Sequence, residues 1–282
     1  MVIADSGSTK TTWRISKNRN EFIDFQTDGI NPYFQSEQDI ALIVKEQLLT
    51  KLDDNWKSEI GDLFFYGAGC SNSEKINQVN AGLKAGFSNW KVYVEHDLLA
   101  SARSLLGNKS GIACILGTGS NSCVFKEGKV TDNIASWGFM FGDYGSGAHI
   151  GKQLVQRYAN NEFSIQVKTE LESKGMNREV ILNNVYQQPL PNRYLARFSK
   201  LAGELIQFNE INELVINSFE LFFRHQVEVY NEHKNHEISF VGSVAHYFYE
   251  QLKTAAENRK LRIGTINKEP IQGLFEYHLN IS

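Results

Sequence analysis

The chain carries the same structural unit twice, and this duplication limits the possible folds more than any other feature. Each copy opens with an apolar strand that ends in a short turn of glycine and hydroxyl residues, D-S-G-S-T at 5–9 and G-T-G-S-N at 117–121. Two further strands follow each turn, and helices then alternate with the remaining strands. Both halves run βββαβαβα once a helical insertion at about 150–235 is set aside. Such a repeat predicts an α/β fold of two similar domains.

Each repeat should form one mixed five-stranded sheet with helices on its faces. We expect a first domain at 1–109, joined by a C-terminal helix at 270–282, and a second domain at 110–269. A cleft would lie between them where the two glycine turns face one another. The pattern also predicts one long helix at 213–233 and another at 245–258. Apolar residues of the insertion, such as Leu214, Phe219 and Phe223, could form either a homodimer face or a domain core.

Charge and cysteine content exclude several classes of function. The 282 residues carry a net charge of −3, which favours neither a nucleic-acid binder nor a membrane-surface protein. No run approaches the roughly 18 apolar residues of a membrane helix, and the N-terminus passes directly into a strand without a signal-peptide pattern. Cys70, Cys114 and Cys123 show no C-x-x-C spacing. We therefore expect reduced thiols in a cytoplasmic protein.

The two glycine turns are suited to binding an anion. Gly7 and the residues around it can present successive backbone N–H groups to a phosphate. Asp5 stands at the strand end, where it could hold a hydrated metal ion beside that anion. Taken alone, residues 5–11 are more typical of a hairpin turn, and only the second copy at 117–119 favours a binding site. Neither G-x-x-x-x-G-K-[ST] nor G-x-G-x-x-G occurs.

Six segments occur in a fixed order along the chain. They are D-S-G-S-T-K-T at 5–11, G-I-N at 29–31, H-D-L-L-A-S-A-R at 96–103, L-G-T-G-S-N at 116–121, W-G-F-M-F-G-D-Y-G-S-G at 137–147 and V-G-S-V at 241–244. In these segments the chain resembles the N-acetylglucosamine kinase and BadF/BadG/BcrA/BcrD ATPase family of the actin, hexokinase and heat-shock-chaperone ATPase superfamily. The resemblance covers nearly the whole chain and implies two ribonuclease H-like (actin-like ATPase) domains.

The resemblance also implies an activity and a set of site residues. The activity is ATP-dependent phosphorylation of a small-molecule sugar, N-acetylglucosamine or a related hexosamine, with Mg²⁺ bridging the β- and γ-phosphates. Asp97 would be the general base, and Asp5 would lie in the outer sphere of the metal. The sugar would be held by Asn31, Asn121, Gly142 and Asp143. The nucleotide would be held by Asp5, Gly7, Ser8, Thr9, Lys10, Thr11, Gly117, Thr118, Gly119, Gly242 and Ser243.

Ordinary structural roles compete with these assignments. Asp97 precedes a helix and, on the residues alone, is more typical of an N-cap. Asn31, Asn121 and Asp143 lie in glycine-adjacent loops, where Asn and Asp are common turn residues. Tyr144 departs from the family pattern, because relatives carry Glu at that position close to the sugar. The exact hexosamine is therefore open at this stage.

Two other functions remain alternatives. The first is an activator ATPase of the same superfamily, which would hold an iron–sulfur cluster through cysteines at a dimer interface; the three cysteines lack the spacing of a cluster motif. The second is a nucleotide-binding sensor without turnover. An intact Asp97 together with both glycine turns argues against a sensor.

Overall fold

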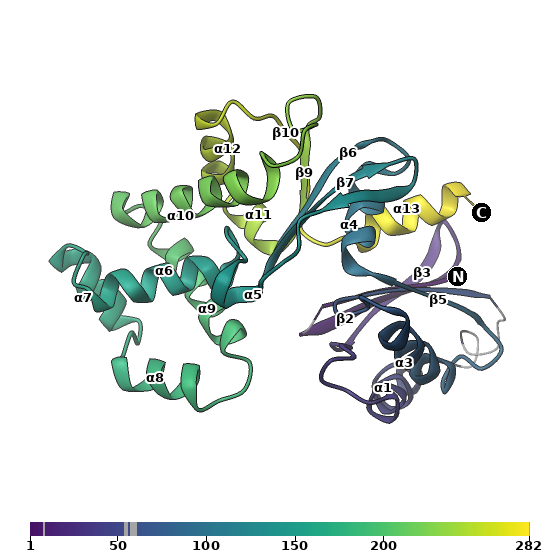
Figure 1. The fold of residues 1–282 in the computed structure, drawn as a ribbon. Coiled ribbons are helices and arrows are strands. Elements are labelled where there is room, and N and C mark those ends of the chain that lie inside the picture. Colours follow the sequence, from purple (N-terminus) through teal and green to yellow (C-terminus); the bar gives the residue numbers. More distant parts are fainter. Residues whose placement is uncertain (8, 54–55, 57–60, 282) are drawn as a thin grey trace. The chain divides into compact units, whose positions relative to one another are not determined.

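The computed structural model describes residues 1–7, 9–53, 56 and 61–281, the side chain of Ile281 excepted. The chain divides into two compact units, Met1–Gly107 with Pro270–Ser282 (unit 1) and Asn108–Glu269 (unit 2). Each unit is built on its own five-stranded mixed sheet, so the predicted α/β fold of two similar sheets is confirmed. Figure 1 shows both sheets with the helices that cover them.

The sheet of unit 1 has the strand order β3-β2-β1-β4-β5. Its central strand β1 is antiparallel to β2 and parallel to β4. The side chains of Val2, Ile3 and Ala4 on β1 are fully buried, as expected for a strand covered on both faces. The strands are β1 (Val2–Ser6), β2 (Lys10–Asn18), β3 (Glu21–Asp28), β4 (Asp62–Gly67) and β5 (Lys91–His96).

The helices of unit 1 are α1 (Glu37–Ile43), α3 (Ser73–Lys84), α4 (Asp97–Leu106) and α13 (Ile271–Ile281). On one face of the sheet, the fully buried ring of Trp13 packs against Phe65 and Phe87, with ring centroids 6.1 and 6.4 Å apart. Helix α13, yellow in Figure 1, returns from the end of the chain to pack on α4. Gly273 permits this contact, since a Cβ there would lie 2.2 Å from the Ser104 carbonyl oxygen.

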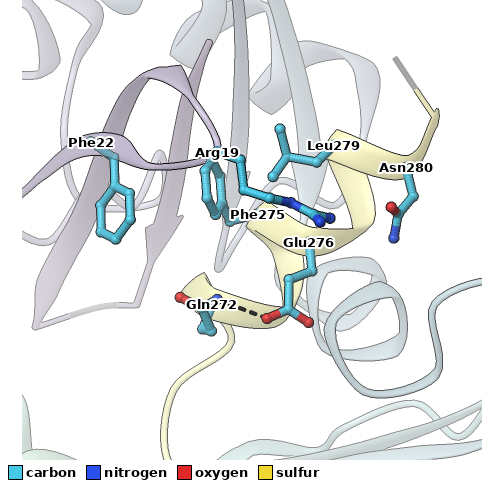
Figure 2. A pocket seen from close by; sticks show the side chains of 7 residues that line it. All are labelled: Arg19, Phe22, Gln272, Phe275, Glu276, Leu279 and Asn280. Carbon is cyan, nitrogen blue, oxygen red and sulfur yellow. Dashed lines mark hydrogen bonds between the residues drawn. The ribbon is translucent and has the colours of Figure 1, made fainter.

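Helix α13 meets strands β2 and β3 through an arginine and two aromatic rings. The Arg14 guanidinium lies 4.2 Å from the Phe22 ring and 5.1 Å from the Phe275 ring, and it pairs with both carboxylate oxygens of Asp24 at 2.8 Å. A hollow of about 370 Å³ remains beside these groups, lined by Arg19, Phe22, Gln272, Phe275, Glu276, Leu279 and Asn280 (Figure 2). The hollow contains none of the predicted site residues.

A buried histidine of α13 also anchors this helix to unit 1. Arg103 Nη1 donates to the Tyr66 hydroxyl oxygen at 2.8 Å, and Tyr66 lies 2.8 Å from His278 Nε2. His278 also stacks on Phe64 at 3.8 Å between ring centroids. Burial, aided by the positive charge of Arg103, lowers the pKa of His278 from 6.5 to about 4. His278 is therefore neutral in the folded protein at physiological pH.

This histidine should make unit 1 sensitive to acid. Between pH 6.5 and 4 the unfolded chain binds a proton at His278 that the folded chain does not, so stability is complete above pH 6.5 and is lost as the pH falls through this window. From pH 6.5 to 5 we expect wild type to lose about 1–2 kcal/mol more unfolding free energy than His278→Gln. Denaturant titrations at both pH values measure this difference. The matched control is His246→Gln, at an exposed histidine of unit 2, and equal losses in wild type and His278→Gln would contradict the assignment.

The sheet of unit 2 has the order β10-β9-β6-β7-β8. Strand β6 repeats the position of β1: it is antiparallel to β7 and parallel to β9. At the edge, β8 is mostly exposed, in agreement with its polar sequence K-V-T-D-N. The strands are β6 (Gly111–Leu116), β7 (Ser120–Lys126), β8 (Lys129–Asn133), β9 (Ile238–Val241) and β10 (Ile263–Asn267).

The helical part of unit 2 forms a large apolar core against this sheet. Phe219 and Phe223 are fully buried and Leu214 is 4% exposed, so their placement on a dimer face is wrong and the core interpretation is confirmed. The helices, coloured teal to green in Figure 1, are α5 (Gly138–Phe141), α6 (Gly147–Ala159), α7 (Ile165–Ser173), α8 (Arg178–Tyr186), α9 (Pro191–Glu204), α10 (Asn209–Phe222), α11 (Ser243–Tyr247) and α12 (Tyr249–Asn258).

Two predicted helices differ from the observed ones. The long helix at 213–233 is wrong beyond residue 227: α10 passes into a π-helical turn at Phe223–Val227 and the chain then forms turns. The segment 245–258 is two helices separated at Phe248. In unit 1, α1 is followed by a π-helical turn at Val44–Leu48 and a 3₁₀ turn at Leu49–Lys51. No helix in the described part of the chain is long and apolar enough to cross a membrane.

Candidate functional site

The first glycine turn closes the β1–β2 hairpin of unit 1. The Gly7 N–H donates to the Lys10 carbonyl oxygen at 3.0 Å. Gly7 does not have a positive φ, and a Cβ there would meet only the Lys10 oxygen, at 3.9 Å, so the turn itself does not require glycine. The open space above Gly7 is instead suited to close approach of a ligand. Thr9 and Lys10 are exposed beside it, and Ser8 lies outside the described residues.

Hydroxyl groups join this turn to the predicted sugar loop. Ser6 Oγ and Thr11 Oγ1 are 2.7 Å apart, and the Ile30 N–H donates to Ser6 Oγ at 2.9 Å. Thr11 Oγ1 also donates to the Asp28 carbonyl oxygen at 3.1 Å. Because Thr11 is fully buried, its hydroxyl supports the loops and is not presented to solvent.

Asn31 is 9% exposed in the loop that follows β3. Its Oδ1 accepts from the Tyr33 N–H at 3.0 Å, and its own N–H donates to Gln35 Oε1 at 2.7 Å. The loop after β4 packs directly on this amide: Gly69 has φ +84°, and a Cβ there would lie 2.6 Å from Asn31 Oδ1. Gly69, to which the sequence assigned no role, is therefore part of the structure that places Asn31.

Asp5 and Asp97 lie at the same edge of the unit 1 sheet. Strands β1, β4 and β5 are parallel neighbours, with Asp5 near the carboxyl end of β1 and Asp97 directly after β5. The carboxyl ends of parallel strands are where α/β sheets bind ligands. Sheet geometry thus brings the predicted metal-associated carboxylate and the predicted base to one edge.

Asp97 is the first residue of α4 and is not its N-cap. The cap is His96, whose Nδ1 accepts from the Leu99 N–H at 3.1 Å, so the capping interpretation of Asp97 is wrong. The helix thus leaves the Asp97 carboxylate without the capping function that the sequence favoured. Burial raises the pKa of Asp97, opposed by the charge of His96 and by the Leu98 N–H. A carboxylate with a raised pKa is a better proton acceptor.

The second glycine turn, in unit 2, is held by the first turn of α6. The Gly117 N–H donates to the Gly119 oxygen at 3.0 Å, while the Gly147 and Ala148 N–H groups donate to the oxygens of Gly117 and Thr118 at 2.8 and 3.1 Å. The carbonyl groups of the turn are thus bonded toward α6. The Thr118 side chain remains exposed.

Asp143 lies directly against this turn. A Cβ on Gly119 would be 2.9 Å from Asp143 Oδ2, so a side chain there would require the Asp143 carboxylate to shift. Asp143 has φ +50°, a conformation that Asp tolerates better than most residues. Ser136 Oγ donates to its Oδ1 at 3.0 Å. Burial raises the pKa of Asp143, opposed by the hydrogen bonds from Ser136 and the Ser120 N–H and by the charge of Lys152.

Gly142 and Asn121 have different surroundings. Gly142 is buried, and a Cβ there would lie 3.3 Å from the Trp137 nitrogen, so the segment before Asp143 packs on itself. Asn121 Oδ1 instead bonds along the sheet, accepting from the Ser122 N–H at 2.9 Å and from Asn133 Nδ2 at 3.1 Å. Gly119, Gly142 and Asp143 therefore lie close together, whereas the side chain of Asn121 is hydrogen-bonded to its neighbours in the sheet.

Tyr144, which departs from the expected family pattern, packs between two histidines. Its ring stacks on His225 at 4.7 Å and meets His149 edge-on at 5.3 Å. His149 Nδ1 lies 2.6 Å from Ser218 Oγ, and burial lowers the pKa of His149 to about 4. The aromatic ring thus fastens the loop after Asp143 to the core of unit 2.

Gly242 brings a third segment to the end of β6. It has φ +130°, and a Cβ there would lie 2.2 Å from the Leu116 carbonyl oxygen. Because Leu116 ends β6 and precedes Gly117, Gly242 adjoins the second glycine turn. Ser243 begins α11 and is exposed. Three of the predicted segments, at 117–119, 142–143 and 242–243, therefore converge in unit 2.

The donor groups suit a metal held with a ligand better than one held by protein alone. Within residues 1–7, 9–53, 56 and 61–281, no group of three or more His, Cys, Asp or Glu side chains is placed to hold a metal ion. Mg²⁺ commonly uses one or two carboxylates together with phosphates and water. Asp5, at the strand end beside the first glycine turn, fits that pattern.

The cysteines are free and buried. Burial raises the pKa of the Cys70 and Cys123 thiols to about 12 and that of Cys114 well above its usual range. An iron–sulfur cluster is held by thiolates. The surroundings of these thiols therefore do not favour the activator ATPase, whose cluster they would have to hold.

Comparisons with known proteins identify the chain's relatives. No family model matches the sequence. A solved structure from Porphyromonas gingivalis, provisionally named an N-acetylglucosamine kinase, is 35% identical and has a TM-score of 0.94 over 99% of both chains. N-acetyl-D-glucosamine kinase of Dictyostelium discoideum is 24% identical in an alignment of 232 positions that covers 75% of this chain and 73% of that protein.

A more distant structure shows the same fold. A ROK family glucokinase from Streptomyces griseus, solved in complex with glucose and AMPPNP, has a TM-score of 0.58 and 12% identity over 100% of this chain and 98% of that chain. Both sheets and the order of their strands are thus those of an actin-like ATPase fold. Because the likeness to the Porphyromonas gingivalis protein extends over both whole chains at 35% identity, this chain belongs to the N-acetylglucosamine kinase-like family of the actin and hexokinase superfamily.

Proposed function

We propose that the protein is a kinase that transfers the γ-phosphoryl group of ATP to a hydroxyl of N-acetylglucosamine or a closely related hexosamine. The observation that carries this proposal is the contact between Gly119 and Asp143. It sets an anion-binding turn directly against a carboxylate that can accept hydrogen bonds from sugar hydroxyls. Family membership supports the choice of sugar, since a relative is named for N-acetyl-D-glucosamine.

The roles divide between the two units. In unit 1, Asp97 accepts the proton of the attacking hydroxyl, and the Asn31 amide binds the sugar. In unit 2, Asp143 and Gly142 bind sugar hydroxyls, and the segment at 242–243 binds the adenosine part of the nucleotide. Backbone N–H groups of residues 7–11 and 117–119 bind the phosphates. Such positioning and charge neutralisation supply most of the catalysis in phosphoryl transfer.

Two of the predicted site residues are given smaller roles in binding than the sequence suggested. Thr11 contributes through the backbone of its strand, because its buried hydroxyl bonds to Ser6 and Asp28. Asn121 is the weakest of the sugar ligands, because its amide oxygen is bonded to Ser122 and Asn133. Mg²⁺ would be held by the nucleotide phosphates, with Asp5 in its outer sphere. The metal ion would neutralise part of the phosphate charge.

The activator and sensor functions fit the chain less well. The activator requires thiolate ligands, whereas all three thiols are buried with raised pKa values. A sensor has no use for a base, whereas the pKa of Asp97 is raised in the direction that base catalysis needs. The free thiols agree with a reducing compartment such as the cytoplasm, where we place the enzyme.

A panel of sugars tests the proposed substrate. Purified protein is incubated with ATP, Mg²⁺ and each of N-acetylglucosamine, N-acetylmannosamine, glucosamine and glucose, and ADP release is followed by a coupled assay with a sugar-free blank. We expect the largest kcat/KM for N-acetylglucosamine and little ADP without sugar, because closed kinase sites exclude water. A preference for glucose would assign the protein to another substrate class, and ADP release that no sugar stimulates would contradict a sugar kinase.

A further inference from the structure

Lys152 lies beneath the segment that leads into Asp143. From α6 its ammonium donates to the carbonyl oxygens of Phe139 at 3.0 Å and Met140 at 3.3 Å. These carbonyls belong to α5, a helix of four residues. Because the helix ends directly after them, they have no later N–H groups of the same helix to accept from. A helix this short is not stable in isolation. The bonds from Lys152 therefore help to hold the segment against unit 2.

The side chains of this segment provide little anchoring of their own. Trp137 is 75% exposed, Phe141 is 76% exposed and Met140 is 59% exposed. Gly138 has φ +66° and Asp143 has φ +50°, so the segment is bounded by two residues in the left-handed region. The hydrogen bonds that hold it to the rest of unit 2 include the two from Lys152 and the one from the Ser120 N–H to Asp143, while the bond from Ser136 Oγ to Asp143 Oδ1 at 3.0 Å joins its two ends.

The same ammonium acts on Asp143 through its charge. Burial raises the pKa of Asp143 and lowers that of Lys152, and each group counteracts the other's shift. The carboxylate also faces Ser136 from the segment and the Ser120 N–H from β7. The neighbouring rings of Tyr144, His149 and His225 pack behind the loop, and His149 is kept neutral by burial and by the charge of Lys152. Lys152 is thus the cation that favours ionised Asp143.

We propose that Lys152 is a positioning residue for the sugar: it fixes the segment 136–142 through the Phe139 and Met140 carbonyls and keeps Asp143 ionised as an acceptor for sugar hydroxyls. The inference rests on the proposed function, because Asp143 is taken as a sugar ligand. It adds a residue that the sequence motifs do not mark. Nucleotide binding does not depend on Lys152 in this account, so the two substrates should respond differently to its loss.

The test compares Lys152→Met, which keeps the length and loses the charge, with Lys152→Arg, which keeps the charge and the donors. Steady-state kinetics with ATP and N-acetylglucosamine give kcat and both KM values from pH 5 to 9. For Lys152→Met we expect KM for the sugar to rise at least about tenfold, the loss expected for a charge-assisted hydrogen bond. KM for ATP should change less than about twofold. In Lys152→Arg, KM for the sugar should be close to the wild-type value.

A pH profile separates a charge effect from general damage. As the pH is lowered, the calorimetric affinity for N-acetylglucosamine without nucleotide should begin to fall at a higher pH in Lys152→Met than in wild type, because Asp143 without the nearby cation is protonated earlier. Lys200→Met, at an exposed lysine of α9, is the matched control and should equal wild type. An unchanged sugar KM and pH profile in Lys152→Met overturns the inference alone. Wild type that neither binds nor phosphorylates any amino sugar overturns the proposed function and the inference together.

Discussion

Asp97→Asn should lower the turnover of the kinase by about 10²–10⁴-fold, the range measured for loss of a general base. Asparagine has nearly the same shape but cannot accept the hydroxyl proton. The affinity for ATP should remain within about twofold, because nucleotide binding is assigned to the glycine turns. Since burial raises the pKa of Asp97, its ionised form is costly in the fold, and the neutral amide should not lower the melting temperature.

The measurement is steady-state kinetics with calorimetric nucleotide affinity and a thermal melt of the same preparation. Glu95→Gln is the matched control, because Glu95 is a nearby carboxylate on β5 with no assigned catalytic role. It should keep turnover within about threefold of wild type. Near-normal turnover in Asp97→Asn would show that another group accepts the proton.

Gly242→Ala should destabilise unit 2 by about 3 kcal/mol or more. The new Cβ would lie 2.2 Å from the Leu116 carbonyl oxygen, which is main chain and cannot move aside, and alanine is strained at φ +130°. Relief requires moving the segment 242–243 away from the second glycine turn. We therefore expect a raised KM for ATP in whatever fraction of the protein remains folded.

Gly117→Ala is the matched control for this prediction. Gly117 is in the adjoining turn, has no positive φ, and a Cβ there would meet nothing within 4 Å. Denaturant unfolding should give Gly117→Ala nearly the stability of wild type, while KM for ATP rises if the turn binds phosphate. Equal stability of Gly242→Ala and wild type would contradict the close approach of residue 242 to the Leu116 carbonyl oxygen.

The repeat pattern predicted both mixed five-stranded sheets, because the two halves of the chain carry the same succession of strands and helices, whereas the strand order comes from the structure. For Phe219 and Phe223 the sequence left two possibilities, a homodimer face or a domain core. The burial of both side chains in unit 2 favours the core. Where helices end was harder to predict. Apolar periodicity continues through Phe223–Val227, yet the backbone there takes a π-helical turn, which apolar periodicity does not distinguish from a continuing α-helix.

Within the site, the motifs located the loops but not the contacts. The cap at α4 was assigned to Asp97 because Asp is a common N-cap, whereas the backbone places His96 in that role. Asn121 was grouped with Asp143 by motif, whereas its place on β7 directs its amide along the sheet. No motif includes Lys152, because it lies in a helix nine residues after Asp143. Its role depends on where α5 packs, which the sequence does not indicate.

If this chain moves the γ-phosphoryl group of ATP to N-acetylglucosamine with Asp97 as the base, the sugar must receive the phosphoryl group that ATP loses. Mass spectrometry of a reaction with γ-¹⁸O-labelled ATP follows this transfer, with ADP and sugar phosphate quantified in the same sample. We expect N-acetylglucosamine phosphate that carries the labelled oxygens, equal in amount to the ADP formed, and almost none with Asp97→Asn. Labelled inorganic phosphate as the product, with no sugar phosphate, would contradict this transfer.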